Sequence, residues 1–113
     1  MAKLATLTLK GSSKKKYIFD VYSYPSEFEK FSCVYCISKR ELNSDNKFVH
    51  DIFYVGKTED ISTILSKHPQ EECFLKNNAN CISLYKLESE PEMAEVEKDL
   101  KNQYNPICNN QPT

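Results

Sequence analysis

The chain has 113 residues, the size of a single domain with a modest hydrophobic core. Its formal net charge is −1, from 15 Lys and Arg against 16 Asp and Glu, and no apolar run is long enough to span a membrane. The charge is uneven, because residues 1–57 carry 10 basic against 6 acidic side chains (+4) and residues 58–113 carry 5 against 10 (−5). A sequence-independent DNA binder is usually more basic, so any nucleic-acid contact is expected on the N-terminal half; an ordinary mixed surface explains the charge equally well.

The N-terminus and the cysteines bear on location and metal binding. The N-terminal sequence predicts no signal peptide, so we expect a cytoplasmic protein with reduced thiols, and five cysteines argue against a full disulfide framework. Cys33 and Cys36 have the spacing of a zinc or redox site, but strand alternation sends their side chains to opposite faces. Cys73, Cys81 and Cys108 form a metal site only if the fold brings them together, and buried structural thiols are the preferred interpretation.

The N-terminal half predicts two hairpins. Residues 4–9 and 17–22 have strand-like patterns separated by a Gly-Ser-Ser turn, which predicts a leading β-hairpin within residues 1–24. Residues 32–38 and 51–55 predict two further paired strands. The polar stretch 39–50 between them predicts a loop.

The C-terminal half predicts helices around one more strand. Thr58 is the expected cap of a helix that reaches His68, and Pro69 ends that helix or begins a second short one through Lys76. Residues 81–87 predict a third strand of the main sheet, and a capping box at Ser89 predicts a helix that stops before a proline. The order predicts an α/β (α+β) fold, with a small central antiparallel sheet flanked by helices and preceded by the hairpin.

Glu97 stands out in the last predicted helix. Met93, Val96 and Leu100 mark a buried stripe at helical spacing, and Glu97 lies on the same stripe. A carboxylate beside a packed face is costly unless it is paired, hydrogen-bonded or bound to metal. The stripe alone leaves two interpretations open, a boundary glutamate that reaches water or a lysine, and a functional carboxylate.

Several separate motifs occur in a recognisable order. The triplets Cys33-Val34-Tyr35 and Tyr54-Val55-Gly56 stand 19 positions apart, and Glu97 is followed by Tyr104-Asn105-Pro106 and Asn109. This set resembles the GIY-YIG nuclease family over residues 33–109. The resemblance implies a nuclease-like core over residues 32–109 within a single domain, 1–113.

The resemblance implies an endonuclease that hydrolyses DNA phosphodiester bonds with one Mg²⁺ or Mn²⁺. Glu97 would be the metal ligand, Tyr35 would orient or deprotonate the attacking water, Tyr54 would line the same cleft, and His68 would lie at its edge. A free phenol has a pKa near 10, so a base role requires a cation or metal nearby. Core packing of the tyrosines and a structural histidine are the alternatives.

One position departs from the family. Its catalytic arginine falls at Ile64, and isoleucine cannot donate a hydrogen bond. Losing one such donor costs a factor on the order of 10²–10³ in rate. Lys57, Lys67 and Arg40 are the cations expected to contact substrate, although none aligns with the missing arginine. Ile64 either extends an apolar stripe or marks a partner surface. The sequence therefore predicts a nuclease weakened at Ile64 or, alternatively, a catalytically inactive module that binds DNA or a protein partner.

Overall fold

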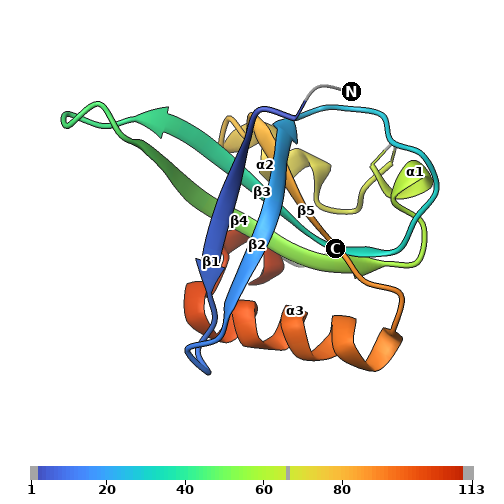
Figure 1. The fold of residues 1–113 in the computed structure, drawn as a ribbon. Helices are drawn as coiled ribbons and strands as arrows, with labels where there is room; N and C mark the ends of the chain where they lie inside the picture. The colour runs from blue at the N-terminus through green and yellow to red at the C-terminus, as the bar shows by residue number, and fades with distance from the viewer. Residues whose placement is uncertain (1–2, 66, 111–113) are drawn as a thin grey trace.

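The computed structural model describes residues 3–65 and 67–110, except the side chain of residue 110, so the ends of the predicted domain 1–113 lie outside the described residues. Five antiparallel strands form one curled sheet in the order β1-β2-β5-β3-β4 (Figure 1). The predicted α/β class, with helices flanking an antiparallel sheet, is confirmed. The strands are β1 (Ala5–Lys10), β2 (Lys16–Ser23), β3 (Cys33–Leu42), β4 (Phe48–Thr58) and β5 (Cys81–Lys86).

Each face of the sheet has its own hydrophobic core. The long helix α3 (Glu90–Tyr104) covers one face, and the short helices α1 (Ile61–Ile64), α2 (Glu71–Lys76) and η1 (Ile107–Asn110) cover the other. Alternation along the strands divides the side chains between the faces, so the core beneath α3 contains Phe19, Val34, Cys36, Val55, Met93, Val96 and Leu100. The opposite core contains Cys33, Tyr35, Ile37, Phe53, Ile61, Phe74, Ile82, Leu84 and Cys108. No helix of the described residues is long and apolar enough to cross a membrane.

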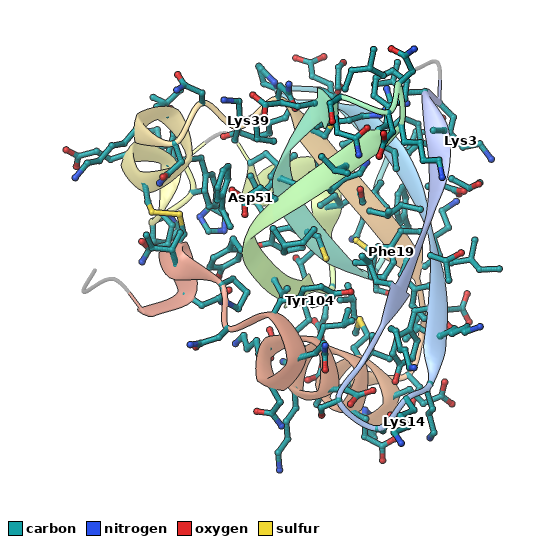
Figure 2. All side chains as sticks on the ribbon, turned by 90° about the vertical axis from the view of Figure 1, so that its left-hand side faces the viewer. Lys3, Lys14, Phe19, Lys39, Asp51 and Tyr104 are labelled. Carbon is teal, nitrogen blue, oxygen red and sulfur yellow. A yellow bond between two sulfur atoms is a disulfide. The ribbon has the colours of Figure 1, made fainter. Side chains whose placement is uncertain are left out.

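The leading hairpin is part of the main sheet. Strands β1 and β2 pair as predicted, and β2 also pairs with β5, so the hairpin extends the sheet instead of standing before it. Its tip is held against α3 by Asp99, which accepts hydrogen bonds from Ser13 Oγ and Tyr17 Oη, both at 2.7 Å. A Cβ on Gly11 would lie 2.0 Å from the Asp99 carboxylate, so only glycine fits at this contact. Figure 2 shows the tip, near Lys14, beside α3.

The predicted loop over residues 39–50 is wrong. Strands β3 and β4 continue through most of it, and residues 43–47 form the turn of a long hairpin. The Asn43 side chain accepts hydrogen bonds from the backbone N–H groups of Asp45 and Lys47, and Asn46 has a positive φ of 61°. Turn chemistry is therefore confined to the tip. Backbone pairing on both sides of it overrides the polar composition that favours a loop.

The predicted helix from Thr58 to His68 is also wrong. Thr58 is the last residue of β4, and the N-cap is Asp60, whose side chain accepts a hydrogen bond from the Ser62 N–H. Helix α1 has only four residues, so His68 lies outside it, in the connection to α2. Thr58 cannot be the cap because it is still paired with Cys33 in the sheet, so the helix begins after Asp60, the first capping residue beyond the strand. In α3, by contrast, Ser89 is the N-cap as predicted, and its oxygen accepts from Glu92 N–H.

Candidate functional site

Two tyrosines from neighbouring strands converge on the face covered by α2. Tyr35 on β3 pairs with Gly56 on β4, and Tyr54 lies two residues before that glycine, on the same side of the sheet. The ring centroids of Tyr35 and Tyr54 are 5.9 Å apart. A Cβ on Gly56 would lie 2.7 Å from Tyr54 Cε2 and 2.8 Å from Tyr35 Cζ and Oη. The absence of a side chain at residue 56 therefore creates the space in which the two rings meet.

The strand predicted over residues 51–55 is longer in the structure. Strand β4 continues to Thr58, so Gly56 lies inside the strand, and its close approach is to the two tyrosine side chains.

His68 completes the group. The Tyr35 hydroxyl lies 2.7 Å from His68 Nε2, and the Gln70 backbone N–H donates to His68 Nδ1 at 3.0 Å. The His68 ring packs edge-on against Tyr54, with centroids 4.8 Å apart, and at a tilt against Phe74 of α2, with centroids 4.9 Å apart. Only 5% of the His68 surface is exposed, because the ring packs against Tyr35, Tyr54 and Phe74 and both ring nitrogens form hydrogen bonds.

Burial controls the protonation of this group. It raises the pKa of Tyr35, with Tyr54 and Glu97 adding to the shift. Burial also raises the pKa of Tyr54, with the negative charge of Glu97 adding to the shift. It lowers the pKa of His68. All three side chains are therefore neutral at pH 7, and the described residues provide no adjacent cation that would lower the pKa of Tyr35.

Glu97 lies on α3, the helix that covers the other face of the sheet. Its side chain is 19% exposed, and its carboxylate lies 3.6 Å from Lys101 Nζ, one turn further along the helix. Its negative charge adds to the raised pKa of both tyrosines, so the three groups are within electrostatic range of one another. Lys57 on β4 forms an ion pair with Glu90 at 2.6 Å, which raises its pKa, and Glu97 adds to that shift as well. The charge of Glu97 therefore influences both tyrosines, and Lys57 lies within the electrostatic range of Glu97.

The other predicted site residues lie apart from this group. Arg40 is five residues beyond Tyr35 on β3, about 17 Å along the strand. Its guanidinium stacks over the Phe48 ring at 3.8 Å. Lys67 is exposed beside His68. Ile64 packs against the core that contains Tyr35 and Phe74, so the apolar interpretation of this residue describes its position.

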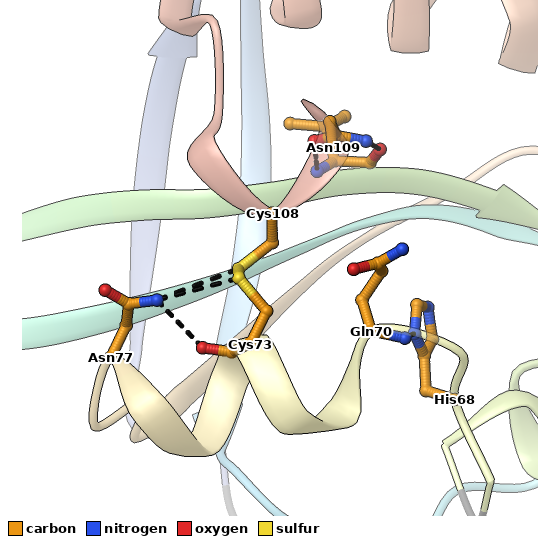
Figure 3. The surroundings of a disulfide bond; sticks show 7 residues. His68, Gln70, Cys73, Asn77, Cys108 and Asn109 are labelled. Carbon is orange, nitrogen blue, oxygen red and sulfur yellow. Dashed lines mark hydrogen bonds between the residues drawn. A yellow bond between two sulfur atoms is a disulfide. The ribbon is translucent and has the colours of Figure 1, made fainter. Parts of the chain in front are cut away.

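The C-terminal segment supports the site from the open edge of the sheet. Strand β4 is an edge strand, and the Asn109 side-chain amide accepts from the Val55 N–H at 2.8 Å and donates to the Val55 C=O at 2.9 Å. Figure 3 shows Asn109 lying against β4, next to the disulfide between Cys73 of α2 and Cys108 of η1. The disulfide therefore joins α2, which contacts the tyrosine–histidine group through Phe74, to η1, which binds the open edge of β4.

The disulfide corrects the expectation that all cysteines remain thiols. Cys73 and Cys108 are 35 residues apart, and only the packing of α2 against η1 brings them together. Cys33, Cys36 and Cys81 are free and buried. Cys33 and Cys36 belong to opposite cores, as strand alternation predicts. Within the described part of the chain, no cluster of three or more His, Cys, Asp or Glu is arranged to hold a metal ion.

Sequence reasoning missed three contributors to this site. Gln70 acts through its backbone N–H, which leaves no mark on residue identity. Phe74 supports the rings of Tyr54 and His68, at 5.4 and 4.9 Å, but appears in the sequence as an ordinary apolar residue. Asn109 is visible in the Asn-Pro pattern, yet nothing in that pattern indicates that its amide binds an edge strand.

Comparison with known proteins adds no assignment. No family model matches this chain, and no curated protein and no solved structure matches it. The functional argument therefore depends on the residues themselves.

Proposed function

We propose that this chain is a GIY-YIG-like domain that acts on DNA phosphodiester bonds, with hydrolysis slowed by Ile64. The observation that carries the proposal is the convergence of Tyr35, Tyr54 and His68 around Gly56. Three residues from separate elements meet within 4.8 to 6.0 Å between ring centroids. These are three of the residues that the resemblance singles out, and a glycine without room for a Cβ lies beneath two of them.

Glu97 is the residue that would hold a divalent ion. Mg²⁺ binds through one or two carboxylates, keeps several waters and takes substrate phosphate oxygens, so a single carboxylate within range of the tyrosines fits it. When bound there, the ion would offset the charge that develops on the phosphate during hydrolysis. Glu97 has a partly exposed lysine as its partner, at 3.6 Å, and such surface ion pairs are worth about 0–1 kcal/mol, so the carboxylate is released at little cost.

Ile64 limits the chemistry. It supplies no hydrogen-bond donor for the phosphate, and it packs inward on the tyrosine core. Lys57 is the cation within electrostatic range of Glu97, but a lysine is a point charge without the two-pronged donor geometry of arginine. The expected rate is therefore lower than that of a complete site by a factor on the order of 10²–10³.

A second function, DNA binding without cleavage, is favoured by the burial of Tyr35. Only 1% of its surface is exposed, and its hydroxyl is already bonded to His68. The raised pKa of Tyr35 opposes a base role. In this alternative the same surface binds DNA, with Lys57 contacting the sugar–phosphate backbone, and no hydrolysis is expected.

Cleavage of plasmid DNA with Mg²⁺ or Mn²⁺ separates the two functions. We expect slow nicking by the natural protein and none by Glu97→Ala. Glu95→Ala is the matched control, since Glu95 is an exposed carboxylate on the same helix. Equal nicking by the natural protein and Glu97→Ala would identify a contaminant and refute the nuclease proposal.

Restoring the arginine provides the complementary test. We expect Ile64→Arg to cleave faster than Ile64→Lys, because the lysine variant adds the charge without the forked donors. Urea denaturation of both variants reports whether they fold, since Ile64 is half-buried. If folded Ile64→Arg neither cuts nor binds DNA at low salt, both DNA functions are contradicted.

A further inference from the structure

The two nitrogens of His68 have partners that fix the position of its proton. A backbone N–H can only donate, so the Gln70 N–H at 3.0 Å requires a bare, accepting Nδ1. A neutral imidazole with a bare Nδ1 carries its proton on Nε2, which lies 2.7 Å from the Tyr35 oxygen. An imidazolium is excluded by the same contact, because it would place two N–H groups head to head.

We infer that His68 is a positioning residue: the Gln70 backbone holds it in the neutral Nε2–H form, so it donates to the Tyr35 oxygen and makes the Tyr35 O–H point away from the histidine. The order of donors is then Gln70 N–H to His68 and His68 Nε2–H to Tyr35. The catalytic meaning of this order rests on the proposed function. The order itself follows from the contacts.

The packing around His68 keeps this arrangement in place. The ring lies between Tyr54 and Phe74, and Phe74 is fully buried on α2. Rotating the imidazole by 180° would place the carbon Cδ2 against the Gln70 N–H and the carbon Cε1 against the Tyr35 oxygen, so both hydrogen bonds would be lost. Burial also disfavours the charged form, which agrees with the neutral ring required by the hydrogen bonds.

The two tyrosines differ in exposure and in hydrogen bonding, so they have different roles in the proposed site. Tyr35 is 1% exposed and accepts the hydrogen bond from His68, so it cannot donate its own proton to His68 and cannot touch DNA directly. Tyr54 is only half-buried and lies beside Tyr35, with the ring centroids 5.9 Å apart. Tyr54 is therefore the hydroxyl presented to a substrate phosphate or to water, and Tyr35 and His68 hold it there.

The ¹⁵N spectrum of the histidine side chains tests the order of donors directly. We expect His68 to show a pyrrole-type Nε2 and a pyridine-type Nδ1 at pH 7. A His68→Phe variant, which keeps the ring packing, assigns the signal by its disappearance. A protonated Nδ1, in either the other tautomer or the imidazolium, would overturn the inference.

Paired substitutions test positioning. In His68→Gln the amide nitrogen occupies the place of Nε2 and keeps a donor for Tyr35. His68→Asn mimics Nδ1 and loses that donor. In proteins with ¹³Cζ-labelled tyrosine, we expect Tyr35 to shift in the asparagine and phenylalanine variants and to stay near its natural position in the glutamine variant. Among folded variants, kcat should fall about fivefold in His68→Asn with KM unchanged and recover in His68→Gln, the factor for one hydrogen bond.

The two kinds of failure are distinguishable. If the expected ¹⁵N and ¹³C signatures appear but no protein cuts DNA, the order of donors is supported and the proposed nuclease function fails. If the protein cuts DNA but His68→Gln and His68→Asn have equal kcat and equal Tyr35 signals, the function stands and the positioning role is overturned.

Discussion

Gly56→Ala is the sharpest test of how the tyrosine pair is built. The added methyl group would lie 2.7 Å from Tyr54 Cε2 and 2.8 Å from Tyr35 Cζ and Oη. Carbon atoms in favourable contact are about 3.5–4.0 Å apart, so the rings must move by about 1 Å or the strands must part. Both movements stretch the 2.7 Å contact between Tyr35 and His68.

The magnitude follows from two opposing effects. Overpacking a well-filled core costs about 1–3 kcal/mol. Alanine recovers part of this, about 0.5–1 kcal/mol, because it loses less backbone freedom on folding than glycine. We therefore expect Gly56→Ala to lower the free energy of unfolding by about 1–2 kcal/mol and the urea midpoint by about 1 M, for a slope of about 1–3 kcal/mol/M.

The other glycine of the chain provides the control. In Gly11→Ala the methyl group would meet the Asp99 carboxylate at 2.0 Å, so this variant also loses stability, but at the hairpin tip. Urea denaturation should detect both losses, whereas the Tyr35 and His68 resonances should change only in Gly56→Ala. If Gly56→Ala is as stable as the natural protein and its Tyr35 resonance is unchanged, the proposed role of the glycine is refuted.

Three further predictions concern the elements around the site. Reducing the disulfide between Cys73 and Cys108 should lower the free energy of unfolding by about 4 kcal/mol, the loop-entropy value for their 35-residue separation. Denaturation with and without a dithiol measures this loss, and a loss under about 1 kcal/mol contradicts the prediction. Asn109→Ala should cost about 1–3 kcal/mol and accelerate hydrogen exchange at the Val55 amide, because both backbone groups on the open edge lose their partner; unchanged exchange would contradict the edge contact. The hydrogen bonds from the hairpin tip, led by Ser13, hold the pKa of Asp99 well below its usual range. The contribution of Asp99 to the free energy of unfolding is therefore complete above the unfolded pKa of about 4 and is lost as pH falls toward the folded pKa. Asp99→Asn should flatten this acid dependence in urea denaturation between pH 7 and 2, and parallel curves for the two proteins would rule it out.

The sequence predicts the strands and the final helix well because their signals are local. Alternation marks β1, β2 and β5, and the cap at Ser89 marks the start of α3. The prediction fails between β3 and β4, where polar residues are part of the strands because their backbones pair, and at α1, where Asp60 replaces Thr58 as the cap. Each failure involves a choice between two local signals that only the assembled sheet decides.

The candidate site is likewise predictable in part from the sequence. The two triplets place Tyr35 and Tyr54 on paired strands, so their proximity is predictable from strand register once pairing is assumed. His68 is predicted near them through a helix that does not reach it, and it arrives instead through the connection to α2. The partner of its Nδ1 is a backbone group, and the support of α2 by η1 depends on a disulfide across 35 residues. No residue pattern encodes contacts of these two kinds.

The two charged residues of the proposed site, Glu97 and Lys57, are already paired in the free protein, and under the proposed function these pairs must be exchanged when a substrate binds. Glu97 is bound to Lys101, and Lys57 to Glu90, with half or less of each side chain exposed. Binding a phosphate with a divalent ion would exchange both pairs, freeing Lys101 and Glu90 to water. Ion pairs at such partly exposed positions are worth about 0–1 kcal/mol each, so the exchange costs no more than about 2 kcal/mol. Charge-assisted contacts to phosphate are worth about 1.5–3 kcal/mol each, so two of them offset that cost. The pairing therefore keeps Glu97 and Lys57 in position without preventing them from acting.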